Sequence, residues 1–127
     1  MNTIREVMRT DLVTVEPSAT LLEAAHAMSM RHAGSALVLE DRVLVGIFTE
    51  RDLMRAMAES STADAARVSS VSGWMTRSPI TIGPNATVGS ALDLMLSGGF
   101  RHLPVVEADA LVGIVSMRDL AESIARQ

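Results

Sequence analysis

The apolar residues of this chain follow two spacings, one typical of strands and one typical of a helix. Short runs rich in β-branched residues have the composition of strands, and they lie at 12–15, 35–39 and 43–48. The turn-like residues 40–42 separate the last two runs, which predicts an antiparallel hairpin. Apolar residues recur every three or four positions from Thr20 to about His32, which predicts a helix with one buried face. A further helix is expected to begin near Thr49, so the predicted order is strand, helix, strand, strand, helix.

The same pattern returns 67 residues later along the chain. Residues 7–58 align with residues 74–125 without a gap, and the clearest match places Leu44–Leu53 against Leu111–Leu120. A repeat of this length is a structural unit. Each copy has only about 50 residues, near the size below which a chain buries too little apolar surface to fold alone, so we expect the two copies to fold as one body. The expected divisions are repeat one, a small polar linker and repeat two, at 1–62, 63–72 and 73–127.

The second copy contains the counterpart of each element. Its expected strands lie at 80–82, 103–106 and 111–115. Its helices are expected to begin near Val88 and Ser116. Gly34 is expected to end the first helix of repeat one, as Gly98–Gly99 ends its counterpart. The predicted fold class is therefore α/β (α+β), built from two strand-helix-strand-strand-helix repeats.

The composition is that of an ordinary folded protein, since 48% of the residues are hydrophobic and 20% are charged. The chain has no cysteine, which excludes disulfides and thiolate metal sites. The net charge is −4 and the basic residues, all arginine, form no cluster, so bulk binding of nucleic acid is not expected. No apolar run approaches the roughly 20 residues that span a bilayer, and no signal peptide is recognisable. We expect a cytoplasmic protein with no membrane partner.

The junction between the third strand and the second helix is the one stretch with chemical content, and it occurs in both repeats. A helix N-terminus with a Thr or Ser hydroxyl favours an anion such as phosphate, and an arginine adds a planar fork of donors. A carboxylate one turn into the helix can accept from two ribose hydroxyls, and a strand glycine lets a ligand approach the backbone. The candidate residues are Gly46, Ile47, Thr49, Arg51 and Asp52 in repeat one, and Gly113, Ile114, Ser116, Arg118 and Asp119 in repeat two.

The hydroxyl and the acid of each junction also have a purely structural interpretation. Thr49 followed by Asp52, like Ser116 followed by Asp119, has nearly the pattern of a capping box. Such a cap stabilises a helix end by about 1 kcal/mol and needs no ligand. Both interpretations stay open at the level of local spacing.

Two further residues, Arg101 and His102, could donate to a phosphate from the start of a buried strand, although a histidine there is as often purely structural. His26 and His32 have no acidic or histidine partner at ligand spacing, so no metal site is expected. The sequence also lacks a cysteine nucleophile, a Gly-x-Ser-x-Gly elbow and a Walker loop. We therefore expect no catalytic residues and no enzyme activity.

With its doubled order of elements and its doubled Gly-x-x-[Thr/Ser]-x-x-Asp junction, the chain resembles a tandem pair of cystathionine-beta-synthase (CBS) domains, a stand-alone Bateman module. The resemblance covers nearly the whole chain and includes the openings Val7–Thr10 and Trp74–Arg77 and the strand Arg101–Val106. It implies two repeats related by a pseudo-twofold axis and packed sheet to sheet, with two clefts between them.

The resemblance also implies which residues face each cleft. One cleft would combine Val13 and Ser35 with Ser116, Arg118 and Asp119, with Arg101 near a phosphate. The other would combine Ile80 and His102 with Thr49, Arg51 and Asp52. Adenine would lie against Ile47 and Ile114, and the aspartates would hold ribose. Because Gly34–Leu37 stands where repeat two has Arg101–Pro104, the clefts differ in charge and size, which leaves open whether one or both are occupied.

Two functions follow from this resemblance. The first is a regulatory sensor that binds an adenosine-containing ligand, such as AMP, ADP, ATP or S-adenosylmethionine, and signals through its conformation or its assembly. This sensor requires no cofactor, and its output would pass to an unidentified protein partner or through a homodimer. The second is a structural homodimerisation scaffold whose clefts stay empty.

Overall fold

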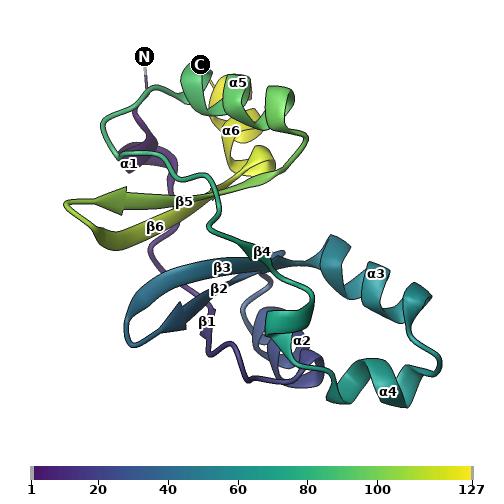
Figure 1. The fold of residues 1–127 in the computed structure, drawn as a ribbon. Helices are drawn as coiled ribbons and strands as arrows, with labels where there is room; N and C mark the ends of the chain where they lie inside the picture. The colour runs from purple at the N-terminus through teal and green to yellow at the C-terminus, as the bar shows by residue number, and fades with distance from the viewer. Residues whose placement is uncertain (1, 127) are drawn as a thin grey trace. The chain divides into compact units, whose positions relative to one another are not determined.

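A computed structural model describes residues 2–126, and the fold divides into two compact units (Figure 1). The first-repeat unit is Val13–Pro79. The second-repeat unit consists of the described residues up to Leu12 together with those from Ile80 onward. Each unit contains the predicted strand-helix-strand-strand-helix order, so the mixed α/β fold class is confirmed.

The first-repeat unit is built on a four-stranded sheet with the order β1-β2-β3-β4. Its strands are β1 (Thr14–Val15), β2 (Ser35–Glu40), β3 (Val43–Thr49) and β4 (Thr76–Arg77). Its helices are α2 (Leu21–Met30), α3 (Glu50–Glu59), α4 (Ala63–Val68) and the short 3-10 turn η1 (Val71–Gly73). Strand β1 runs parallel to β2, while β2, β3 and β4 are antiparallel neighbours.

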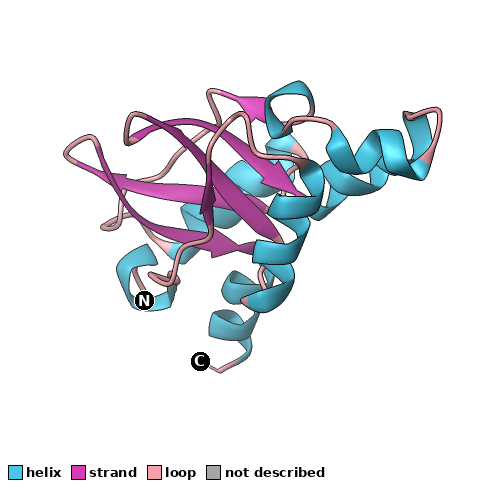
Figure 2. Ribbon diagram, turned by 90° about the horizontal axis from the view of Figure 1, so that it is seen from below, coloured by secondary structure: helices cyan, strands magenta, loops and turns pink. Residues whose placement is uncertain are grey.

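The second-repeat unit has the same plan with less regular edges. Its elements are α1 (Ile4–Val7), α5 (Val88–Gly98), β5 (His102–Glu107), β6 (Ala110–Ser116) and α6 (Met117–Ala125). The β5–β6 hairpin is flanked by two single bridges, from Ile82 to Val105 and from Arg9 to Ile114. These bridges occupy the places that β1 and β4 have in the other unit. Figure 2 shows the strands and helices of both units by colour.

The segments 4–9 and 71–77, at about the start of each repeat, pack with the sheet of the other repeat and are called the exchanged segments below. Ile4 is fully buried in the core of the second-repeat unit, and Val71, its counterpart, is fully buried in the first-repeat unit. The bridges repeat this exchange, since Thr3 pairs with Thr87 as Ser70 pairs with Thr20. The compact units therefore differ from the ranges 1–62 and 73–127 read from the sequence repeat. The prediction that the two repeats form one module stays a prediction.

Two local features differ from the sequence-based expectations. Helix α2 ends at Met30 rather than at Gly34, because the chain turns at Arg31 and His32 takes a left-handed conformation with φ 51°. The expected strand at 80–82 is reduced to the single bridge at Ile82, close before Pro84, which has no N–H to continue a ladder.

The polar linker at 63–72 is also more ordered than its composition indicates. It holds α4, whose N-cap Thr62 accepts the N–H of Ala65 through Oγ1 at 3.0 Å, and Ala66 is fully buried. Within residues 2–126, no helix combines the length and the apolar character needed to cross a bilayer.

Candidate ligand-binding site

Each strand-to-helix junction forms a complete capping box. In α3, the N–H of Asp52 donates to Thr49 Oγ1 at 3.4 Å, and Asp52 Oδ2 accepts the N–H of Thr49 at 2.8 Å. In α6, the N–H of Asp119 donates to Ser116 Oγ at 3.1 Å, and Asp119 Oδ2 accepts the N–H of Ser116 at 2.8 Å. The structural interpretation of these residues is therefore correct for both repeats, and each cap occupies only one carboxylate oxygen.

The first turn of each helix has few N–H groups left for an anion. Besides the two bonded in the capping box, the N–H of Glu50 donates to Gly34 O at 3.1 Å, and the N–H of Met117 donates to Arg101 O at 2.8 Å. Three of the four N–H groups that a helix leaves without intrahelical partners are thus already bonded to the protein. Recognition of a phosphate at these junctions would have to rely on side chains such as the Arg118 guanidinium.

The two junction glycines are explained by packing. A Cβ on Gly46 would lie 2.5 Å from Met75 Sδ and 3.0 Å from Thr76 O. A Cβ on Gly113 would lie 2.6 Å from Met8 Sδ and 3.0 Å from Arg9 O. These positions therefore need glycine because the exchanged segment lies directly against the strand, whether or not a ligand is bound.

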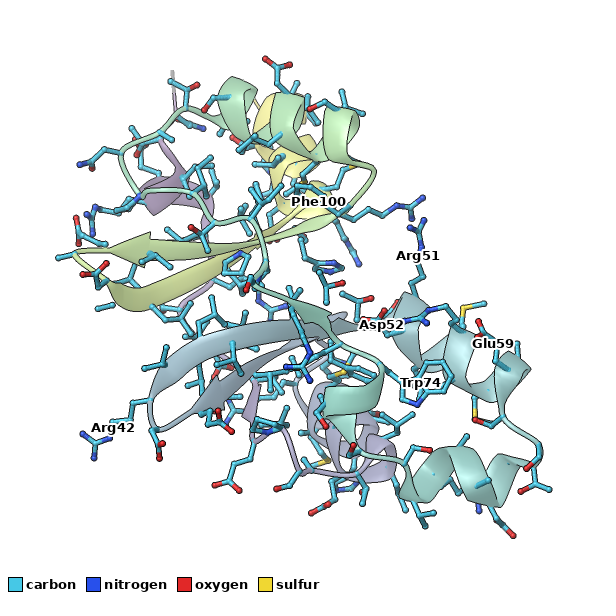
Figure 3. All side chains as sticks on the ribbon, in the orientation of Figure 1. Arg42, Arg51, Asp52, Glu59, Trp74 and Phe100 are labelled. Atoms are coloured by element: carbon cyan, nitrogen blue, oxygen red, sulfur yellow. The ribbon has the colours of Figure 1, made fainter. Side chains whose placement is uncertain are left out.

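The carboxylate of Asp52 has a second, charged partner. Arg55 Nη2 lies 3.4 Å from Asp52 Oδ1 and donates to Trp74 O at 3.0 Å. The guanidinium carbon of Arg55 also lies 5.0 Å from the centre of the Trp74 ring, within the range of a cation–π contact. Figure 3 shows Asp52 at the start of α3 and the Trp74 ring beside that helix. The side chain of Asp52 is only 10% exposed.

The carboxylate of Asp119 lacks this partner. Among residues 2–126, no hydrogen bond or ion pair reaches Asp119 Oδ1, and the residue is half-buried. Its neighbour Arg118 pairs with Glu122, with Nε 3.4 Å from Oε1. The side chains of that pair are 85% and 52% exposed, so solvent screens their attraction.

The other predicted site residues lie on strands or at their ends. Ser35 pairs with Thr49 across β2 and β3, and His102 pairs with Ser116 across β5 and β6. Of the remaining candidates, Val13 and Ile47 are buried, Ile114 is half-buried, and Arg51, Ile80 and Arg101 are exposed. The structure thus brings Ser35 to the junction of its own repeat and does the same for His102. The predicted sets that combine residues of both repeats stay predictions.

Sequence reasoning missed Arg55 and Trp74. Arg55 follows Asp52 by three positions on a predicted helix, a spacing at which opposite charges meet, so this signal was present in the sequence. Trp74 lies 19 positions further along, and only the fold brings it to Arg55.

Comparison with known proteins finds the same doubled unit. A family model described as the CBS domain matches the chain twice, at residues 4–59 and 68–126. The crystal structure of a CBS-domain-containing protein from Agrobacterium tumefaciens is 34% identical in sequence and has a TM-score of 0.90. That similarity covers 97% of this chain and 99% of the other.

Two more distant crystal structures share the fold. One, the structure of the protein CBSX2 in complex with AMP, is 24% identical and has a TM-score of 0.84. The other is a CBS domain pair in complex with 5′-methylthioadenosine and S-adenosyl-L-methionine, 21% identical with a TM-score of 0.88. In both cases the similarity covers 99% of this chain and 98% of the other.

Proposed function

We propose a ligand-binding regulatory function for this chain, which belongs to the CBS domain family. The ligand is an adenosine compound of the AMP, ADP, ATP or S-adenosylmethionine class, and it contacts the strand-to-helix junction. Two proteins of the same fold were crystallised with AMP and with S-adenosyl-L-methionine, which supports this ligand class.

One observation carries the proposal. Asp119 Oδ2 is held by the N–H of Ser116 at 2.8 Å, while Oδ1 has no partner among the described residues. The carboxylate is thus fixed in orientation and keeps lone pairs available for the two hydroxyls of a ribose. Arg118, exposed and next in sequence, supplies a cation for a phosphate once it leaves its weak pair with Glu122.

The function is regulatory rather than catalytic. The carboxylates at the two junctions repeat one role, that of a cap, whereas an acid/base pair needs two groups in different environments. The bound ligand changes the conformation or assembly of the chain, and a protein partner or a second copy of the chain receives the signal.

A thermal-shift series tests this proposal. The wild type and the Asp119→Asn variant are each heated without ligand and with AMP, ADP, ATP or S-adenosylmethionine. The amide oxygen of the variant can still accept the capping bond. A ligand at a hundred times its dissociation constant stabilises the folded state by about 2.7 kcal/mol, a rise in Tm of about 4 °C or more. The shift relative to each variant's own ligand-free Tm should appear in the wild type and be reduced to about half or less in Asp119→Asn, as a site at least about tenfold weaker requires. A Tm that no ligand raises contradicts the proposal.

A structural homodimerisation scaffold is the second candidate function. Two observations favour it: both junctions are complete capping boxes without any ligand, and α3 exposes Met54 and Met57 by 72% and 46%. The scaffold predicts a Tm that rises with protein concentration and responds to no nucleotide. The same thermal series, repeated over a hundredfold range of protein concentration, separates the two functions.

A further inference from the structure

We infer that Arg55 decides which junction binds the ligand: with Trp74 it closes the Asp52 junction, so the chain takes its adenosine ligand at Asp119 alone. The pair of Arg55 and Trp74 is called the arginine clamp below. This inference rests on the proposed function and specifies its site.

The guanidinium of Arg55 makes three contacts, one with the carboxylate of Asp52 and two with Trp74. Arg55 Nη2 is 3.4 Å from Asp52 Oδ1 and 3.0 Å from Trp74 O, and the guanidinium carbon is 5.0 Å from the ring centre. The capping bonds from the Thr49 N–H and hydroxyl occupy Oδ2, at 2.8 and 3.2 Å. Both oxygens of Asp52 are therefore engaged within the first-repeat unit, and its charge is already compensated.

The second repeat lacks both parts of the clamp. At the position equivalent to Arg55 it has Glu122, and at the position equivalent to Trp74 it has Val7. Val7 packs on the core of the second-repeat unit and offers no ring face to a guanidinium. Glu122 carries the same charge as Asp119 and so cannot compensate it. The carboxylate of Asp119 is the one that stays available.

A ribose that binds Asp52 must compete with Arg55 Nη2 for Oδ1, and the two contacts of Arg55 with Trp74 keep the guanidinium in that place. A ribose that binds Asp119 displaces no protein group from the carboxylate. A hydrogen bond to a charged group is commonly worth enough to change an equilibrium constant about tenfold or more. We expect the two junctions to differ in affinity for the same ligand by at least about tenfold for this reason.

Separate isothermal titrations of the full chain with AMP, ADP, ATP and S-adenosylmethionine test the inference. The wild type should bind one equivalent, and Asp119→Asn should weaken that binding at least about tenfold. Arg55→Gln removes the charge that engages Asp52 and should add a second binding event. The matched control is Arg67→Gln, because Arg67 and Asp64 form an ion pair of the same spacing and the same 3.4 Å distance on α4. This control should leave the stoichiometry unchanged.

A second experiment does not depend on whether Arg55→Gln folds, because it introduces the two clamp residues into the second repeat. The double variant Val7→Trp/Glu122→Arg builds the arginine clamp at the second junction and should weaken the single site of the wild type at least about tenfold. Circular dichroism of each variant verifies that it is folded.

The outcomes separate the two claims. Binding of two equivalents of equal affinity to the wild type overturns the inference and leaves the proposed function standing. The inference is also overturned if the wild type has a single site whose affinity Asp119→Asn does not weaken. It is likewise overturned if Arg55→Gln is folded but shows no second binding event. If neither the wild type nor Arg55→Gln binds any of the four compounds, the proposed function fails and the inference fails with it.

Discussion

Met75 packs directly over Gly46, so closely that a Cβ on residue 46 would lie 2.5 Å from its sulfur. Met8 and Gly113 form the same contact in the second-repeat unit, at 2.6 Å. In both cases the methionine lies near the start of one repeat and the glycine lies in the hairpin of the other repeat. These two contacts secure the exchanged segments to the sheets, and they explain why the glycine recurs in both repeats.

Gly46→Ala should destabilise the protein by about 1–3 kcal/mol, the usual cost of forcing an extra methyl group into a packed core. The flexible Met75 side chain can move aside, but the carbonyl of Thr76, 3.0 Å from the new Cβ, belongs to a strand ladder. Urea unfolding measures the effect. Gly83→Ala is the control, since a Cβ there meets nothing within 4 Å. Equal stability of the two variants would contradict the packing explanation.

Ile4→Ala should cost about 2–5 kcal/mol, the range for a fully buried aliphatic side chain. Ile4 is fully buried among core residues such as Leu103 and Leu120, although it lies four residues from the start of the sequence. Leu96→Ala, at a residue 65% exposed, should change the free energy of unfolding by no more than about 0.5 kcal/mol. An Ile4 variant as stable as the Leu96 variant would show that the N-terminal segment contributes little to the second-repeat unit.

Glu23 should make the stability of α2 depend on pH. The backbone N–H and the hydroxyl of Thr20 bind its carboxylate at 2.9 and 3.0 Å, and these bonds lower the pKa of Glu23 below its ordinary value of 4.5. Because the pKa is lower in the folded state, the stabilisation is present above pH 4.5 and is lost as the pH falls through the folded-state value. The difference in Tm between wild type and Glu23→Gln should therefore shrink toward acid pH.

A suitable control for this pH effect is Glu59→Gln, which removes the same charge from the C-terminal end of α3. It breaks no capping box. If both variants show the same pH profile relative to wild type, the cap of Glu23 is not the source of the effect.

Arg55 and Trp74 should be energetically coupled. A double-mutant cycle with Arg55→Ala and Trp74→Leu should give an interaction energy of about 0.5–1 kcal/mol, the size of a partly exposed cation–π contact. The side chain of Arg55 is 46% exposed, so solvent limits the electrostatic part. Additive effects of the two substitutions would mean that the ring contact contributes nothing to stability.

The elements of the fold were predictable where local signals define them. Thr49 and Ser116 were predicted to begin helices and do so, because a hydroxyl followed three positions later by an acid caps a helix through neighbouring residues alone. The turn expected at 40–42 was equally local: Asp41 and Arg42 take the positive φ values that a two-residue hairpin turn requires, as do Ala108 and Asp109 in the second hairpin.

What the sequence did not reveal depends on contacts between distant segments. The local pattern marks Ile4 as apolar but does not indicate that it joins the core that also contains Leu103, because every buried aliphatic residue gives the same local signal. The end of α2 at Met30 was missed because His32 adopted the left-handed conformation for which glycine was expected. Arg55 was overlooked because its role depends on Trp74, which reaches it only in the folded chain.

Equilibrium dialysis with radiolabelled AMP, ADP, ATP and S-adenosylmethionine measures whether the junction at Asp119 binds an adenosine compound. We expect saturable binding of at least one compound to the wild type, weakened about tenfold or more in Asp119→Asn, which can keep the helix cap. No saturable binding of any of the four compounds, or equal binding by both proteins, would show that Asp119 does not hold such a ligand.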